Sequence, residues 1–445
     1  MAQSAAVTAG KGTENMLFAT VTAAVTCLLM IASILFFPRL RIGQLTLDTY
    51  WMVTLAGALV MLFAEKGRFA MVGRTLVADT AVNPLKILAL FLSMTVLSVY
   101  LDELGFFRVL AARTLKRAGK SQTRLFFCLY ALVSVLTVFT SNDIIILSFT
   151  PFICYFARHA GIDPLPYLAA EFVAANSWSM LLVIGNPTNI YLATAAGIDF
   201  ARYLRVMALP TLAAGGVSLL CLWLCFRRRL AAPISPAEVD EPPLRDRPLL
   251  VVGLVHLGVC TLALAISSYI GAEMWLISVV AVACLAVSVL LLSSLRRRPA
   301  HELWAAFGRA PWQLVPFLLS MFSMIAVLGQ VGTIDLLTGL LCRGNTVFTC
   351  GVGSFLFANL INNIPMSVLF GAAVPPGDPG ALYATVVGSN LGALLTPVGA
   401  LAGIMWSGIL ARHGHRFGYR DFLRLGASVG IPALAAALLA LWGTV

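Results

Sequence analysis

Charged residues are scarce in this chain. They make up 11% of the 445 residues, whereas hydrophobic residues make up 60%. A soluble domain carries about 25% charged residues, so this sequence cannot cover a water-facing surface of its size. Many of its apolar runs have the roughly 17–25 residues that cross about 30 Å of hydrocarbon. We therefore expect an all-α protein that crosses a membrane many times.

Several motifs of soluble chemistry are also missing. The nine cysteines form no CxxC pair, and their odd number argues against a disulfide framework. The five histidines do not cluster, so we predict no metal site. The sequence has no GxxxxGK[ST] loop for ATP and no nucleophile–base pair, so we expect neither a cofactor nor an enzyme. No basic stripe interleaves with aromatic residues, which argues against nucleic acid as a partner.

The net charge of +11 is concentrated in short segments between apolar runs. Six Lys and Arg residues lie in 105–124, five arginines in 227–247 and four in 293–312. Such loops mark the cytoplasmic side of a membrane protein. Because a pair of apolar runs, 248–292, separates the last two segments, both lie on one side, which is consistent with this orientation. The pattern predicts a multi-pass protein of the bacterial inner membrane, in contact with lipid.

The basic, proline-rich segment 227–247 is the natural boundary within the chain. We interpret residues 1–15 as a polar tail, 16–226 as a first membrane half and 248–445 as a second half, joined by 227–247 as a cytoplasmic linker. We expect about 10–12 membrane segments in all.

The order of elements repeats in the two halves, but the charge does not. A glycine-led segment, an asparagine-containing break, a second polar cluster and an aspartate-led final helix follow one another in each half. Segment 105–124 is strongly basic, whereas its counterpart 330–345 holds only Asp335 and Arg343 as charged residues. One loop is therefore inside and the other outside. This pattern predicts inverted-topology repeats, with a solute site near the bilayer midplane.

Four polar clusters interrupt the apolar sequence, two in each half. Glycines and prolines next to them predict discontinuous helices and re-entrant hairpins, with short half-helices at 144–156 and 365–374. Buried amides and hydroxyls need hydrogen-bond partners or a ligand. We predict that these clusters bind the solute, through Ser141, Asn142, Asn176, Ser177, Asn186, Thr188, Asn189, Asn362, Asn363, Ser389, Asn390 and Thr396.

Few acidic residues fall inside apolar segments. Asp143 lies in the first polar cluster and Glu171 precedes the second, so these two are our candidates for coupling to a proton or cation. Asp102 and Glu103 end an apolar run beside basic residues, and we expect water to solvate them. We expect Lys86 to extend towards the membrane surface and assign no role to Glu273 in a short loop.

Several motifs give the sequence a family resemblance. They are Leu101-Asp-Glu-Leu-Gly-Phe-Phe107, Ser141-Asn-Asp143 with Thr150-Pro151, Arg309-Ala-Pro-Trp-Gln313, Asn362-Asn-Ile-Pro365, and Leu395-Thr-Pro-Val-Gly-Ala-Leu-Ala402 followed by Trp406. Over roughly residues 85–440 the chain resembles the bacterial arsenite and antimonite efflux permeases. These belong to the ion transporter superfamily, with sodium/proton antiporters and divalent anion/sodium symporters.

The resemblance implies proton-coupled efflux of arsenite or antimonite, and hence arsenical resistance. It also implies a small inorganic or anionic solute, and it leaves open a soluble ATPase subunit and a homodimer as partners. Asn176 and Asn390 stand where the arsenite permeases usually carry acids, and the Gly185-Asn-Pro-Thr-Asn189 stretch is closer to the wider superfamily. Two alternatives therefore stay open: a sodium- or proton-coupled transporter of a dicarboxylate or inorganic oxyanion, and a sodium/proton antiporter.

Overall fold

The computed structural model describes residues 2–42, 45–64, 68–78, 83–232, 246–374 and 377–445, and these are almost entirely helical. Within this part of the chain, eight helices are long and apolar enough to cross a membrane. Four shorter apolar helices accompany them, at Thr49–Phe63, Thr346–Ile361, Asn363–Ala373 and Leu401–Arg412. The predicted all-α, multi-pass membrane fold is confirmed.

The N-terminal elements pack onto the second half of the chain. Helix α1 (Ala2–Phe36) lies against α2 (Thr49–Phe63), and α2 lies against α14 (Leu314–Gln330). Residues 2–15, which we expected to form a polar tail, continue the backbone of α1. A short antiparallel pair and a small amphipathic helix complete this region: β1 (Arg39–Ile42), β2 (Leu45–Asp48) and α3 (Arg68–Val77).

A first hairpin is formed by α6 and α7. Both of its ends lie near the end of α10, because Thr123 donates to the Leu230 carbonyl (3.1 Å) and Arg229 pairs with Asp163 (2.9 Å). Helix α7 has 19 residues, so it is longer than the half-helix predicted at 144–156; the polar residues at its end extend the helix. The helices of this region are α4 (Pro84–Glu103), α5 (Phe106–Ala118), α6 (Gln122–Phe139) and α7 (Asn142–Ala160).

The second hairpin, formed by α16 and α17, repeats the first. Gly332 precedes α15 with φ 81°, as Gly105 precedes α5 with φ 82°, and a left-handed conformation of this kind favours glycine. Thr346 donates to Asp378 (2.6 Å), which holds the two ends of this hairpin together. The helices are α15 (Thr333–Leu341), α16 (Thr346–Ile361) and α17 (Asn363–Ala373).

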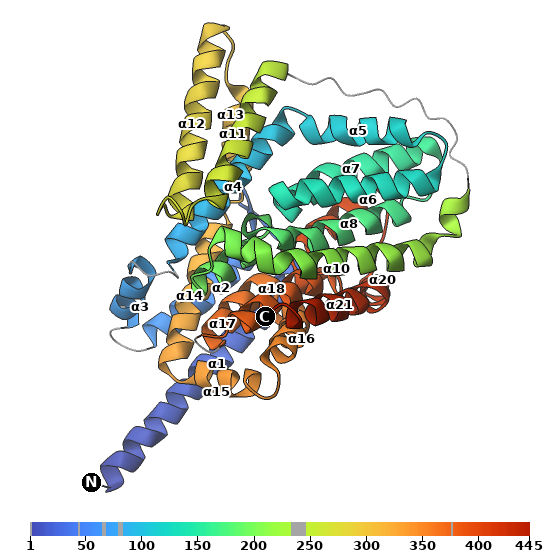
Figure 1. Ribbon diagram of the computed structural model, residues 1–445. Helices are drawn as coiled ribbons and strands as arrows, with labels where there is room; N and C mark the ends of the chain where they lie inside the picture. Colours follow the sequence, from blue (N-terminus) through green and yellow to red (C-terminus); the bar gives the residue numbers. More distant parts are fainter. Residues whose placement is uncertain (1, 43–44, 65–67, 79–82, 233–245, 375–376) are drawn as a thin grey trace.

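A broken helix and a long helix follow each hairpin. The hairpins exchange partners between the halves: α7 packs on α19, and its counterpart α17 packs on α9. The long helices α10 and α21 run antiparallel side by side (Figure 1), as expected for counterparts in inverted repeats. The elements are α8 (Leu165–Trp178), η1 (Ser179–Leu181), η2 (Val183–Gly185), α9 (Pro187–Ala195), α10 (Phe200–Phe226), η3 (Arg229–Ala231), α18 (Pro379–Gly392), η4 (Pro397–Gly399), α19 (Leu401–Arg412), α20 (Tyr419–Leu425), η5 (Gly426–Gly430) and α21 (Ile431–Trp442).

Helices α11 (Arg247–Ala265), α12 (Met274–Leu295) and α13 (His301–Arg309) pack along α4, and α11 and α12 extend from one end of the molecule (Figure 1). Asp246 pairs with Arg296 (3.1 Å) and Arg298 (2.6 Å), which joins the start of α11 to the end of α12. The division into halves at 16–226 and 248–445 stays our proposal; within the linker 227–247, residues 233–245 lie outside the described residues.

The end of α4 corrects one expectation. Asp102 is only 5% exposed, not solvated. Its carboxylate pairs with Arg309 at 2.9 Å and accepts a hydrogen bond from Ser148 of α7 at 2.8 Å, and Glu103 pairs with the same Arg309. These contacts join two of the motifs that carry the family resemblance. The pairing partner lies about half the chain away, so local sequence could not show it.

Replacing Gly388 tests the closest helix contact of the second half. A Cβ there would lie 1.9 Å from Ser354 Oγ and 2.3 Å from the Gly351 carbonyl oxygen of α16. We expect Gly388→Ala to force α16 and α18 apart, at a cost of about 1–3 kcal/mol. Gly258→Ala is the control, because nothing lies within 4 Å of its Cβ position. The measurement is the thermal midpoint in detergent, and equal midpoints would contradict this packing.

Candidate solute-binding site

The first break separates α6 from α7 at Thr140 and Ser141, which are both extended. Ser141 caps α7 by accepting a hydrogen bond from the Asp143 amide (3.3 Å), as serine commonly does at a helix start. Asn142, the first residue of α7, donates to Asn176 Oδ1 of α8 at 3.1 Å. The tip of the first hairpin is thereby fixed to the helix beside it.

The second break lies between α8 and α9. Gly185 is required here, because a Cβ would lie 2.1 Å from the Ser179 carbonyl oxygen. Asn186 caps α9, accepting from the amide and the hydroxyl of Thr188, both at 3.1 Å. Asn189 donates to the carbonyls of Ser179 (2.9 Å) and Leu182 (3.2 Å), which the break has freed. Side-chain amides thus replace the missing helical hydrogen bonds.

The third break falls at Asn362, between α16 and α17. Its φ of 74° and ψ of 150° lie in a region that residues other than glycine rarely adopt, at a cost of about 1–3 kcal/mol. The side chain offsets part of this cost: Oδ1 accepts from the Ile364 amide (3.3 Å), and Nδ2 donates to the Val398 carbonyl (3.0 Å). Asn362 therefore joins the third break to the fourth.

The fourth break lies between α18 and α19, around η4. Thr396 donates to Asn359 Oδ1 at 2.6 Å, and Asn359 Nδ2 donates to the Gly392 carbonyl at 3.0 Å. Asn359 was not among the site residues that we predicted from the sequence. An asparagine three residues before Asn362 on an otherwise apolar helix was the available signal. In the first half, Thr137 plays a similar part by donating to the Ala175 carbonyl (3.2 Å).

Asn390 joins the two halves. Its Nδ2 donates to Asn189 Oδ1 (2.7 Å) and to the Val386 carbonyl (2.9 Å). Its Oδ1 accepts from Ser179 Oγ (3.0 Å) and Asn186 Nδ2 (3.1 Å). A carboxamide offers two donors and an acceptor oxygen with two lone pairs, so all the hydrogen-bonding capacity of Asn390 is used inside the protein. Ser179, which sequence analysis also missed, belongs to this junction.

Two predicted site residues are occupied by bonds between helices. Ser177 lies 3.5 Å from Ser218 of α10, and Ser389 lies 3.1 Å from Ser367 of α17, oxygen to oxygen. The twelve predicted residues are therefore gathered around the four breaks, but they differ in how much hydrogen-bonding capacity remains.

Asn363 has the most capacity left. It is the first residue of α17, as Asn142 is of α7, and its Oδ1 is buried without a hydrogen-bond partner among the described residues. A buried carbonyl oxygen without a partner costs about 1–3 kcal/mol. Asn142, in contrast, is bonded to Asn176. Asn363 is therefore the predicted site residue whose side-chain oxygen is buried and unpartnered within the described part of the chain.

The two candidate coupling acids lie in different surroundings. The Asp143 carboxylate lies in the first turn of α7 and makes no hydrogen bond or ion pair within the described part of the chain. Glu171 is fully buried and accepts from Thr150 Oγ1 at 2.8 and 3.1 Å. Trp406 of α19 lies next to Glu171, although its buried indole N–H does not reach hydrogen-bond distance. Neither acid forms an ion pair within the described residues.

The chain is similar to known transporters over most of its length. A family model described as citrate transporter (CitMHS) matches residues 13–377. The arsenical pump membrane protein of Escherichia coli K12 is 28% identical over 372 residues, covering 79% of this chain and 85% of its own. A putative arsenical pump membrane protein of Bacillus subtilis is 24% identical, covering 75% and 81%. The resemblance to the arsenite permeases is confirmed.

A solved structure shares the fold. The YdaH transporter of Alcanivorax borkumensis, described as having an unusual topology, superposes with a TM-score of 0.59. The match covers 96% of this chain and 97% of that one at 16% sequence identity. At this identity the similarity concerns the fold alone. The family model and the relatives show that the protein is a membrane transporter.

Replacing Asn362 separates its backbone role from its side-chain role. Both Asn362→Ala and Asn362→Gly lose the bonds to Ile364 and Val398, but glycine adopts this backbone conformation without strain. We therefore expect the alanine variant to have the lower thermal midpoint, by a difference equivalent to about 1–3 kcal/mol. An alanine variant as stable as the glycine variant would show that the positive φ is wrong.

Proposed function

The chain belongs to the citrate transporter family, and we propose that it is a proton-coupled exporter of arsenite and antimonite in the bacterial inner membrane. Relatives named as arsenical pump membrane proteins, and the motifs shared with them, support this proposal. A soluble ATPase subunit and a homodimer remain predictions based on resemblance.

The observation that carries the proposal is the uncharged character of the twelve side chains that we predict to bind the solute. The twelve site residues are all amides or hydroxyls, and no hydrogen bond described for them involves Lys, Arg or His. Arsenite at neutral pH is mainly a neutral trihydroxide, which can donate and accept hydrogen bonds here without burying net charge. Citrate would bring negative charges that have to be neutralised in a low-dielectric site.

The spare hydrogen-bonding capacity divides the site residues into two groups. Asn189, Asn362 and Asn390 spend their amides on the protein and hold the breaks in place. Asn363 and Asn142 stand at the first positions of α17 and α7, and Asn363 has an unused acceptor. We assign the solute hydroxyls to Asn363 and, in exchange for its bond with Asn176, to Asn142.

Asp143 is the group that we assign to proton coupling. Its position in the first turn of α7 favours the carboxylate through the helix dipole, whereas burial in a membrane favours the neutral acid. Opposing effects of this kind allow a carboxyl group to bind and release a proton. The equivalent position of the second half, two residues after the cap Asn362, is Ile364. Coupling is therefore assigned to one half only.

Glu171 is a second carboxyl group that can carry a proton. It is 0% exposed, and the only partner described for it is the hydroxyl of Thr150. A buried carboxylate without a counter-ion is strongly disfavoured, so the neutral acid is the expected resting form. Thr150 lies on α7, eight residues after Asn142. Protonation or deprotonation of Glu171 would therefore alter its hydrogen bond to the hairpin that carries the site.

The family model itself supports a second candidate, a sodium- or proton-coupled transporter of a small anion such as a dicarboxylate. Bound cations would have to supply the positive charge that the site residues lack. Uptake into proteoliposomes that requires sodium would favour this candidate over arsenite export, and arsenite accumulation that needs only a proton gradient would exclude it.

Everted membrane vesicles test the proposed activity. Vesicles energised by respiration should accumulate arsenite, and a proton ionophore should abolish this while removal of sodium should not. Asp143→Asn should reduce accumulation to the level of vesicles that lack the transporter, because an amide side chain cannot bind and release a proton. Asp335→Asn, in the exposed first turn of α15, is the matched control and should remain active. Arsenite accumulation by Asp143→Asn at the normal rate would contradict the coupling role.

Replacing Asn363 tests the direct ligand. Its Oδ1 has no partner among the described residues, so Asn363→Ala should leave the thermal midpoint nearly unchanged. Loss of one hydrogen bond to the solute should raise KM for arsenite by about tenfold, since such a bond contributes about 0.5–1.5 kcal/mol and its buried partner is left unpaired. An unchanged KM, measured in the same vesicles, would remove Asn363 from the solute site.

A further inference from the structure

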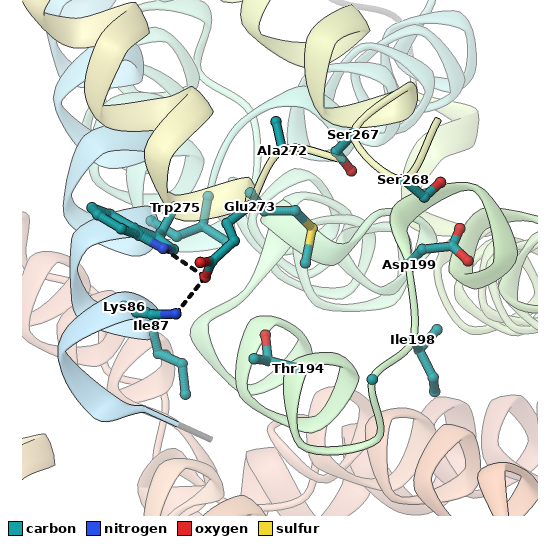
Figure 2. Close-up of a pocket in the computed structure, with 13 residues that line it drawn as sticks. Lys86, Ile87, Thr194, Ile198, Asp199, Ser267, Ser268, Ala272, Glu273 and Trp275 are labelled. Carbon is teal, nitrogen blue, oxygen red and sulfur yellow. Dashed lines mark hydrogen bonds and ion pairs between the residues drawn. The ribbon is translucent and has the colours of Figure 1, made fainter. Parts of the chain in front are cut away.

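A cavity of about 380 Å³ lies away from the four helix breaks (Figure 2). Three segments enclose it: the start of α4 with Lys86, the α9–α10 connection from Thr194 to Asp199, and the α11–α12 turn from Ser267 to Trp275. Small-molecule sites in proteins occupy roughly 300–1,000 Å³, so the cavity has room for a small hydrated solute.

The charges of the connecting helices place this cavity on the outer side. Each helix that lines it has its arginine-rich end elsewhere: α4 leads into α5, α10 leads to Arg227–Arg229, and α12 leads to Arg296–Arg298. Arginine-rich ends mark the cytoplasmic side. Lys86, Asp199 and Glu273 stand at the opposite ends of these helices and therefore face the outside.

One helix connects the cavity to the central site. Thr194, which lines the cavity, lies five residues after Asn189 on α9. At about 1.5 Å per residue this separates the two by roughly 7 Å along the helix axis. Helix α4 lies beside α9 and contributes Leu90 to the same cavity. A solute leaving the breaks along α9 and α4 would reach this space next.

The charges that line the cavity disfavour anions. Lys86 Nζ pairs with Glu273 Oε2 at 2.6 Å, and the Trp275 indole N–H donates to the same oxygen at 2.8 Å (Figure 2). Asp199 is the third charged residue of the lining, so the net charge of the lining is negative. The remaining polar groups include the hydroxyls of Thr194 and Ser267. This composition repels a carboxylate or oxyanion and accepts a neutral solute rich in hydroxyl groups.

We propose that this cavity is the outer vestibule of the transport pathway, a second station that holds a neutral hydroxylated solute and excludes anions through Asp199 and Glu273. The nature of the solute rests on the proposed function, whereas the position and charge of the vestibule do not. The experiment therefore measures access and charge first, and transport separately.

Thiol labelling tests access. In a variant without native cysteines, Thr194→Cys should react with membrane-impermeant methanethiosulfonate reagents added to intact cells. Lys120→Cys, exposed beyond the end of α5, is the control and should react only in everted vesicles. Reaction of the Thr194→Cys thiol from the cytoplasmic side alone, or from neither side, would overturn the proposal.

Reagents of opposite charge test the field inside the vestibule. Relative to a free thiol, the cationic reagent should label Thr194→Cys several times faster than the anionic one. Glu273→Gln and Asp199→Asn should each reduce this preference by up to roughly sevenfold, because removing one charge at about 7 Å in a water-like medium slows the cationic reagent and speeds the anionic reagent by about threefold each. Equal relative rates before these changes would refute exclusion of anions.

Transport gives an arm that needs no cysteine replacement. External citrate should leave arsenite efflux from cells with the native charges unaffected and should inhibit it in the Asp199→Asn, Glu273→Gln double variant. Efflux that citrate inhibits equally in both would refute the charge barrier. If arsenite is not transported at all but the labelling results are as expected, the vestibule is supported and the proposed solute is contradicted.

Discussion

A helix that breaks inside a bilayer exposes amides and carbonyls that lipid cannot satisfy, and the rest of this structure depends on how those groups are paired. Each break is supplied with a short polar side chain: Ser141, Asn186 and Asn362 cap the helices that follow, and Thr396 is held by Asn359. The breaks are therefore grouped, because the amides that satisfy one come from the next. A centre lined mainly by amides and hydroxyls is the direct result of this requirement.

The sequence predicted where the helices break but not what each polar residue does there. Polar residues in apolar surroundings, with glycine or proline beside three of the four clusters, were sufficient to locate the breaks. The sequence could not show which polar residues bond to the protein and which remain available to a ligand, because this depends on contacts between residues far apart in the chain. Asn390 looked like a ligand, yet its partners Ser179, Asn186 and Asn189 lie about two hundred residues earlier and occupy its oxygen and one of its two N–H donors. The burial of Asp102 by Arg309 has the same cause.

The two halves have matching elements but different chemistry. Asp143 and Glu171 belong to the first half, and a hydrophobic residue, Ile364, stands at the position that corresponds to Asp143. Asn142 is bonded to Asn176, whereas Asn363 has a free acceptor. The repeat thus accounts for the architecture, while the departures from symmetry place the two membrane-buried acids in one half and the unpartnered Asn363 oxygen in the other.

The contacts of Asn390 have a mechanical consequence. Pulling the two broken helices apart would break the bonds of Asn390 with Asn186 and Asn189 in a medium that offers no replacement. The inner helices therefore resist separation at the contact between the two repeats. During transport we expect these inner helices to move together against α4 and α11–α13, which are joined to one another by ion pairs.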